Sequence, residues 1–267
     1  MRRFCTISIF LCVSIFADAQ DARLRAALLE REAFRSEEPA EAGRLLLDKA
    51  ALLLDAGQAQ AAGEALSRVR TWLLDETEQQ TYRRLREEAF FRAGAYDAAD
   101  SFREPAGGDA RLDALVAAGI RRYEESRTLA AQHLQAVLPE AELPQALHAL
   151  DALYANAPRL KKEKTATALA FLPPLGHWYT GHYGEGLFSM LGNAAAAGLI
   201  VWQVLDGSYI TGLLGGGMLL ERTFMSNVEN SAAHARAYNE AAQEDFLRRL
   251  DALLPQPVSP GRSEVRP

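Results

Sequence analysis

The feature that most constrains the fold is a pair of apolar runs in the stretch Phe171–Asn239. The first run, Leu187–Leu205, is followed by the polar turn Asp206–Ser208 and by a second, glycine-rich run, Tyr209–Leu220. Extended back to Gly184, the first run makes roughly 33 Å of helix, which is enough to cross a bilayer. The sequence therefore predicts a two-helix transmembrane hairpin with an interfacial entry over residues 171–239.

Small and aromatic residues are placed in this stretch as in paired membrane helices. Ala194–Gly198 and four glycines of the second run form small-residue faces, which let helices approach closely in lipid. Aromatic residues that suit the two interfacial belts flank the runs: Trp178, Tyr179, Trp202 and Tyr209. The same small-residue faces predict a homo-oligomer in which the hairpins of separate copies pair. The alternative is a buried hairpin of a soluble domain.

Three polar residues fall inside the predicted hairpin: Asn193, Glu221 and Arg222. A charge in lipid is costly unless it is paired or lies near the headgroups. If the turn centres on Gly207, Asn193 and Glu221 lie at the same depth in two antiparallel helices. We therefore expect Glu221 to face Asn193 or to pair with Arg222. The second run spans a bilayer only if its helix continues beyond Arg222.

The N-terminus resembles a secretory signal, which we place over residues 1–19. Arg2 and Arg3 precede the apolar segment Ile7–Phe16, and small residues lead to a cleavage site before Gln20. An uncleaved anchor helix is the alternative, although the apolar segment is short for a span. A lipoprotein signal is rejected because Leu11 precedes Cys12.

Composition excludes several classes of function. The only two cysteines, Cys5 and Cys12, lie within the predicted signal, so we expect no disulfide, thiol chemistry or cysteine metal site in the mature chain. The formal charge is −6 and there is no basic stripe, which argues against nucleic acid as a partner.

The segment 20–155 is expected to be an independently soluble, all-α domain of tetratricopeptide-like repeats. Leucines and alanines recur at helical spacing, and Gly57 and Gly94, 37 residues apart, end two helices of equivalent position. A third long helix is expected over Asp109–Glu125. The alternative is a plain antiparallel helical bundle. Repeats of this kind stack into surfaces that bind protein partners.

The remaining segments are shorter. Residues 156–170 form a predicted basic hinge, whose Arg159–Lys164 cluster suits anionic headgroups as well as a solvated linker. A separate C-terminal helix is expected over 240–254. The proline-rich tail over 255–267 is expected to be disordered.

The hairpin entry carries a sequence motif. Its residues are Pro173, Gly176, Tyr179, Gly181 and Gly186, followed after the second run by Asn227, Tyr238 and Asn239. The pattern resembles bacterial tetratricopeptide-like envelope proteins with a C-terminal glycine-rich membrane hairpin, a family with no established chemistry. The chain departs from that pattern at Pro174, His177 and Glu229. The resemblance implies a bacterial cell-envelope membrane, and the predicted signal places the helical domain on its periplasmic side.

We predict no catalytic, cofactor-binding or metal site. His177, His182 and Glu185 have metal-ligand chemistry, but their spacing matches no known signature, and an interfacial turn is the preferred interpretation. His148 and His234 are interpreted as lone residues, and no nucleophile elbow is present.

Two hypotheses of function remain. The first is a membrane-tethered envelope scaffold, not an enzyme, whose repeats bind a protein partner while the hairpin contacts the bilayer. The second is a subunit that acts through the hairpin itself, in membrane assembly or as part of a channel.

Overall fold

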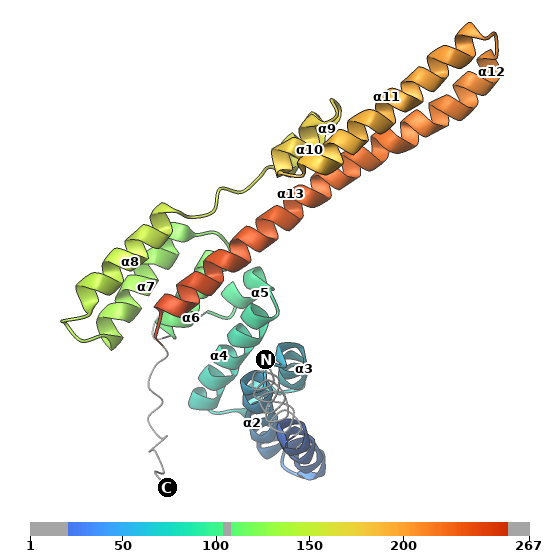
Figure 1. Cartoon of the computed structure of the whole chain (residues 1–267). Coiled ribbons are helices and arrows are strands. Elements are labelled where there is room, and N and C mark those ends of the chain that lie inside the picture. The colour runs from blue at the N-terminus through green and yellow to red at the C-terminus, as the bar shows by residue number, and fades with distance from the viewer. Residues whose placement is uncertain (1–20, 104–107, 256–267) are drawn as a thin grey trace, which may run out of the picture. The chain divides into compact units, whose positions relative to one another are not determined.

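The computed structural model describes residues 21–103 and 108–255, and the regular elements within those ranges are all helices (Figure 1). The predicted all-α class is confirmed. The predicted signal, with Cys5 and Cys12, and the tail beyond Pro255 lie outside the described residues. The chain divides into two compact units: one holds the residues up to Ala155 and those from Leu250 onward, and the other holds Asn156–Arg249.

The first unit is a succession of helices in which each, from α2 onward, packs against the next along the chain. A helix over residues 21–35 comes first. The others are α2 (Pro39–Asp55), α3 (Ala59–Ser67), α4 (Glu76–Arg92), α5 (Tyr96–Asp100), α6 (Ala110–Gly119), α7 (Tyr123–Val137) and α8 (Leu143–Ala155), with a short 3-10 helix, η1 (Thr71–Leu73), before α4. Buried leucines and alanines of α2 and α3 form an apolar cluster with Ala26 and Ala33 of the first helix.

One backbone turn recurs between these helices. Gly57 has φ +73°, its N–H donates to the Leu54 carbonyl, and the N–H of the next residue, Gln58, donates to the Leu53 carbonyl. This is the Schellman arrangement, in which a left-handed residue ends a helix. Gly94, with φ +76°, makes the same turn before α5. Both glycines were predicted from sequence to end helices.

The same turn at Arg121 corrects the prediction of one long helix over Asp109–Glu125. That prediction is wrong, because α6 ends at Gly119 and α7 begins at Tyr123. Arg121 has φ +67°, and the N–H groups of Arg121 and Arg122 donate to the Ala118 and Ala117 carbonyls. A left-handed residue other than glycine leaves no sequence signal of the kind seen at Gly57.

The last described residues of the chain belong to the first unit as well. Leu250 and Leu254 are buried, and Arg111 of α6 donates to the Leu254 carbonyl and pairs with Asp251. His133 of α7 donates to the Pro255 carbonyl at 2.8 Å. The sequence placed this unit within residues 20–155, and the structure adds these later residues to it.

The second unit contains two short helices and a long helical hairpin. The short ones are α9 (Glu163–Ala170) and α10 (Leu175–Thr180), and the hairpin comprises α11 (Tyr183–Leu205), α12 (Tyr209–Thr211), the π-helical turn η2 (Gly212–Gly216) and α13 (Gly217–Leu253), of which residues up to Arg249 belong here. α13 runs through residues 239 and 240 without interruption, as no glycine or proline breaks it there. The segment predicted as a hinge is helical from Glu163.

The hairpin turns at Gly207, which has φ +82°, and α13 returns alongside α11 (Figure 1). The helices approach each other closely where Gly212 and Gly216 face α11, since a Cβ atom at Gly216 would lie 2.5 Å from Ile200 Cγ1. Among the described residues, α11 is the one helix long and apolar enough to cross a membrane, and only 6% of its apolar window is buried. Trp202 lies exposed in its last turn.

Candidate functional site

Two asparagines of α13 fix the segment Lys161–Thr180, named here the entry segment, by hydrogen bonding to its backbone. The Asn227 side-chain amide donates to the carbonyl of Ala170, at the end of α9. Asn239 accepts from the Lys161 N–H at 2.7 Å and donates to the Lys161 carbonyl at 2.8 Å. Because all three bonds use backbone groups of the entry segment, they fix the path of its main chain at Lys161 and Ala170.

Two tyrosines of the predicted motif surround Lys161. Its Nζ lies 3.9 Å from the ring centroid of Tyr238 and 5.8 Å from that of Tyr179. The Tyr179 hydroxyl also accepts from the Lys162 N–H at 3.1 Å. Cation–π contacts of this kind favour a positive charge beside the rings. The basic residues at the start of the entry segment are therefore partly engaged with α10 and α13.

Three motif glycines lie where a side chain would clash or where the backbone has a positive φ. A Cβ atom at Gly176 would be 2.6 Å from Ser231 Oγ, so only glycine lets α10 approach α13 so closely. A Cβ atom at Gly186 would be 2.8 Å from the indole of Trp178. Gly181 has φ +90° and turns the chain from α10 into α11. The remaining motif residue, Pro173, lies in the turn between α9 and α10.

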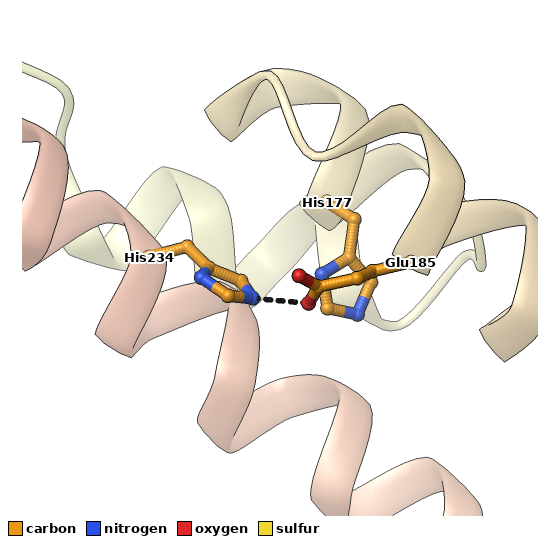
Figure 2. Close-up of side chains that lie close together, drawn as sticks. All are labelled: His177, Glu185 and His234. Atoms are coloured by element: carbon orange, nitrogen blue, oxygen red, sulfur yellow. Dashed lines mark hydrogen bonds and ion pairs between the residues drawn. The ribbon is translucent and has the colours of Figure 1, made fainter.

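Side chains from three elements gather where α10, α11 and α13 meet. His177 of α10, Glu185 of α11 and His234 of α13 offer ligand atoms that all lie within 4.8 Å of one another (Figure 2). His234 Nε2 is 2.7 Å from a Glu185 carboxylate oxygen. His182 stacks on His234, with ring centroids 3.7 Å apart. Figure 2 shows the Glu185 carboxylate close to both imidazoles.

His177 is the buried member of this group, whereas Glu185 is exposed and His234 half-buried. Burial lowers the pKa of His177 below its ordinary value, and the neighbouring His234 lowers it further. The negative charge of Glu185 and the Asn227 side chain oppose this lowering of the pKa.

Sequence reasoning considered His177, His182 and Glu185 together but set His234 apart as a lone residue. His234 lies 49 residues from Glu185 along the chain, so no local spacing connects them. The signal that relates them is Gly176, whose close approach to Ser231 brings α10 against α13. His234 lies three residues after Ser231, on the same face of the helix.

We expected Glu221 to face Asn193 or to pair with Arg222, and the structure gives Asn193 a different partner. Thr223 Oγ1 donates to Asn193 Oδ1 at 3.1 Å, and Asn193 donates back along its own helix to the Ser189 carbonyl. Glu221 and Arg222 are both exposed. Thr223, which the sequence did not single out, is therefore the residue that α13 presents to Asn193.

A hollow of about 580 Å³ opens between α11 and α13 beside these groups. It is lined by His177 and Glu185 at one end and by polar side chains of α13 that include Arg222, Thr223 and Asn227. The hollow thus places one guanidinium and one carboxylate in the same space within the second unit.

The first unit holds a separate pair of buried acids, Glu87 of α4 and Asp113 of α6. Burial, followed by the charge of Asp113, raises the pKa of Glu87 to about 8. Burial also raises the pKa of Asp113, to about 6, although Arg103 opposes the rise. The pair was not predicted from sequence, because Glu87 lies in a strongly charged helix that is typical of an exposed face, and no local spacing connects it to Asp113.

Comparisons with known proteins provide no further assignment. No family model, no curated protein and no solved structure matches this chain.

Proposed function

We propose that the protein is a membrane-anchored scaffold, in which the hairpin crosses a bilayer and the first unit binds a protein partner. The observation that carries the proposal is the outward-facing apolar surface of the hairpin. Its exposed large side chains include Leu187, Phe188, Leu191, Val201, Leu205, Ile210, Leu213, Leu214 and Met218. A membrane is the environment in which such a continuous surface is stable.

The energetics support a bilayer rather than water around α11. Removing one large aliphatic or aromatic side chain from water contributes about 1.5–3 kcal/mol, and the hairpin exposes many of them. The backbone is compatible with lipid as well, because helices satisfy their own N–H and C=O groups. Asn193 and Thr223 satisfy each other in the space between the helices.

The scaffold part of the proposal rests on the succession of paired helices in the first unit. Helices joined by a repeated turn and packed mainly on their sequence neighbours resemble solenoid repeats, which present extended surfaces to protein partners. The signal-like N-terminus and the motif resemblance support a bacterial envelope membrane, with this unit on the periplasmic side.

Fractionation of the full-length protein tests the membrane anchor. We expect it to remain with membranes through a high-salt wash and an alkaline carbonate wash, and to be released by detergent. A matched pair of variants changes two exposed residues at a time: Leu213→Glu with Leu214→Glu in the hairpin, and Leu24→Glu with Leu28→Glu in the first helix. Only the hairpin pair should reduce the membrane-bound fraction, and release of the unmodified chain by salt alone would refute the anchor.

Site-specific photo-cross-linking tests the scaffold. A cross-linking residue on the exposed surface of the first unit, for example in place of Trp72, is expected to capture one discrete envelope protein in living cells. The same residue in place of Leu213 should capture lipid or another copy of this chain. If only the residue in place of Leu213 captured a protein, the partner-binding surface would be the hairpin and not the first unit.

A second function, assembly through the hairpin, is favoured by glycines that the hairpin does not use for its own packing. A Cβ atom at Gly192, Gly198, Gly215 or Gly217 would meet no other atom within 4 Å. Exposed small residues let a second helix approach closely in lipid. Such positions fit another copy of the hairpin, as in an assembly or channel-type subunit.

A further inference from the structure

We infer that His177, Glu185 and His234 form a binding site for a divalent transition-metal ion, with zinc as the best-suited ion. The chemistry of the three donors carries the choice of metal. Two imidazoles and one carboxylate are a donor set that zinc accepts, whereas calcium and magnesium require oxygen ligands. In sites of this kind zinc keeps a fourth position for water or a further ligand.

The backbone explains why the three donors converge. The left-handed turn at Gly181 folds α10 back onto the first turn of α11, which brings His177 beside Glu185. The absence of a side chain at Gly176 lets α13 pass close by, with Ser231 against α10 and His234 one turn further on. The Asn227 and Asn239 hydrogen bonds hold the entry segment on α13 on either side of this point.

The positions of the three donor atoms also support a bound metal ion. All three donor atoms lie within 4.8 Å of one another, so small side-chain rotations bring them to the roughly 2.0–2.2 Å bonds of zinc. His177 is almost fully buried, so its ring is held in place beside the other two donors. Glu185 already lies 2.7 Å from His234 Nε2, so one negative charge is in place to offset that of the cation.

A fourth ligand would have room to bind. The hollow of about 580 Å³ reaches His177 and Glu185 and also contains Arg222. Water or a small anion there would approach the metal from the side that the protein leaves open. The bound metal would link α10, α11 and α13, and so would fasten the entry segment to the base of the hairpin. This inference goes beyond the proposed scaffold function and does not depend on it.

The test measures zinc binding by the full-length protein, purified in detergent without a polyhistidine tag. Zinc content after gel filtration is measured by elemental analysis, and affinity is measured by competition with a chelating dye. We expect about one zinc ion per chain, because the described residues hold one cluster of this kind. Millimolar magnesium should not compete, since imidazole ligands do not suit that ion.

The variants avoid the buried His177. Glu185→Gln and His234→Gln replace side chains that are exposed or half-buried, and circular dichroism verifies their fold. Each should weaken zinc binding by at least about tenfold, the loss that follows even from removing groups that only support a ligand. His148→Gln, an exposed residue of α8, is the control and should bind zinc as the unmodified chain does.

A second readout does not depend on stoichiometry. Zinc should raise the melting temperature of the unmodified chain and of His148→Gln, and should leave that of Glu185→Gln and His234→Gln nearly unchanged, because a ligand stabilises only the fold that binds it. The inference is overturned if the purified chain holds no stoichiometric zinc, or if the Glu185→Gln and His234→Gln variants bind it as tightly as the control.

Discussion

The side-chain amide of Asn227 donates a hydrogen bond to the backbone carbonyl of Ala170, which precedes it by 57 residues. Asn227 is buried in the middle of α13, and Ala170 is the last residue of α9. The bond therefore satisfies one of the carbonyls that a helix leaves open at its C-terminal end. It also ties a short helix, which would be marginal alone, to a long one.

Asn227→Ala is expected to loosen α9 without unfolding the hairpin. Loss of a buried hydrogen bond that leaves its acceptor unpaired typically costs about 1–3 kcal/mol. Amide hydrogen exchange of the full chain in detergent should show faster exchange over residues 163–170, and unchanged exchange over α11. Asn230→Ala is the matched control, since Asn230 is exposed and bonds only within its own helix. Equal protection of α9 in the two variants would contradict the prediction.

Asn193 and Thr223 should be energetically coupled. Removing both partners of a hydrogen bond costs less than the sum of the single changes, and we expect a coupling of roughly 0.5 kcal/mol or more between Asn193→Ala and Thr223→Val. The measurement is a double-mutant cycle on unfolding in detergent. Asn193→Ala combined with Glu221→Gln provides the comparison and should be additive. If Asn193→Ala were coupled to Glu221→Gln and not to Thr223→Val, the Asn193–Glu221 pair expected from sequence would be correct and the Asn193–Thr223 pair wrong.

The glycines of η2 provide a contrast between two neighbouring positions. A valine at Gly216 would strike Ile200 of α11, whereas a valine at Gly215 would point into open space. Gly216→Val should therefore destabilise the hairpin by about 1–3 kcal/mol, as overpacking typically does. Gly215→Val should leave the melting temperature unchanged but convert any oligomer to monomer in detergent gel filtration. If both variants melt alike, α11 and α13 do not pack through Gly216.

The stability of the first unit should fall as the pH rises. In the folded protein the pKa of Glu87 is raised to about 8, well above the ordinary carboxyl value, so the folded state holds its proton more tightly than the unfolded chain. The favourable protonated state is fully present at acid pH and is lost as the pH rises through about 8. The pKa of Asp113 is also raised, to about 6, so Asp113 too lowers the stability of the fold as the pH rises, over a lower pH range.

Glu87→Gln imitates the protonated acid and should abolish much of this dependence. At pH 9 the variant should exceed the unmodified chain in free energy of unfolding by on the order of 2 kcal/mol, and near pH 5 the difference should shrink. Chemical unfolding followed by ellipticity across this pH range measures it. Glu140→Gln, at an exposed position, is the control. A difference that grows toward acid pH would show that Glu87 is ionised in the fold.

The sequence allowed prediction of features that local chemistry determines. Gly57 and Gly94 adopt the positive φ values expected of helix-ending glycines, and α11 ends at Leu205, where the apolar run ends. Arg121 takes the same backbone conformation without being a glycine, next to a close contact between helices. A Cβ atom at the nearby Gly119 would lie 2.6 Å from the Tyr96 ring, so α6 packs against α5 immediately before the turn.

The candidate site was harder to predict because it depends on how helices rotate and align. Counting residues from Gly207 placed Glu221 level with Asn193, but Thr223 occupies that place. The π-helical turn η2 contributes to the shift, because it fits additional residues into its turn. His234 was likewise beyond prediction, since its neighbours come from helices that only the packed structure brings together.

The exposed Trp202 at the tip of the hairpin has a consequence for optical spectroscopy. The chain has three tryptophans, and Phe replacements at Trp72 and Trp178 would leave Trp202 as the sole indole emitter. Indole emission shifts to shorter wavelength in an apolar medium, and brominated lipids quench it according to depth. The protein therefore carries a built-in fluorescent probe in the last turn of α11, from which the depth of the hairpin turn can be determined without an added label.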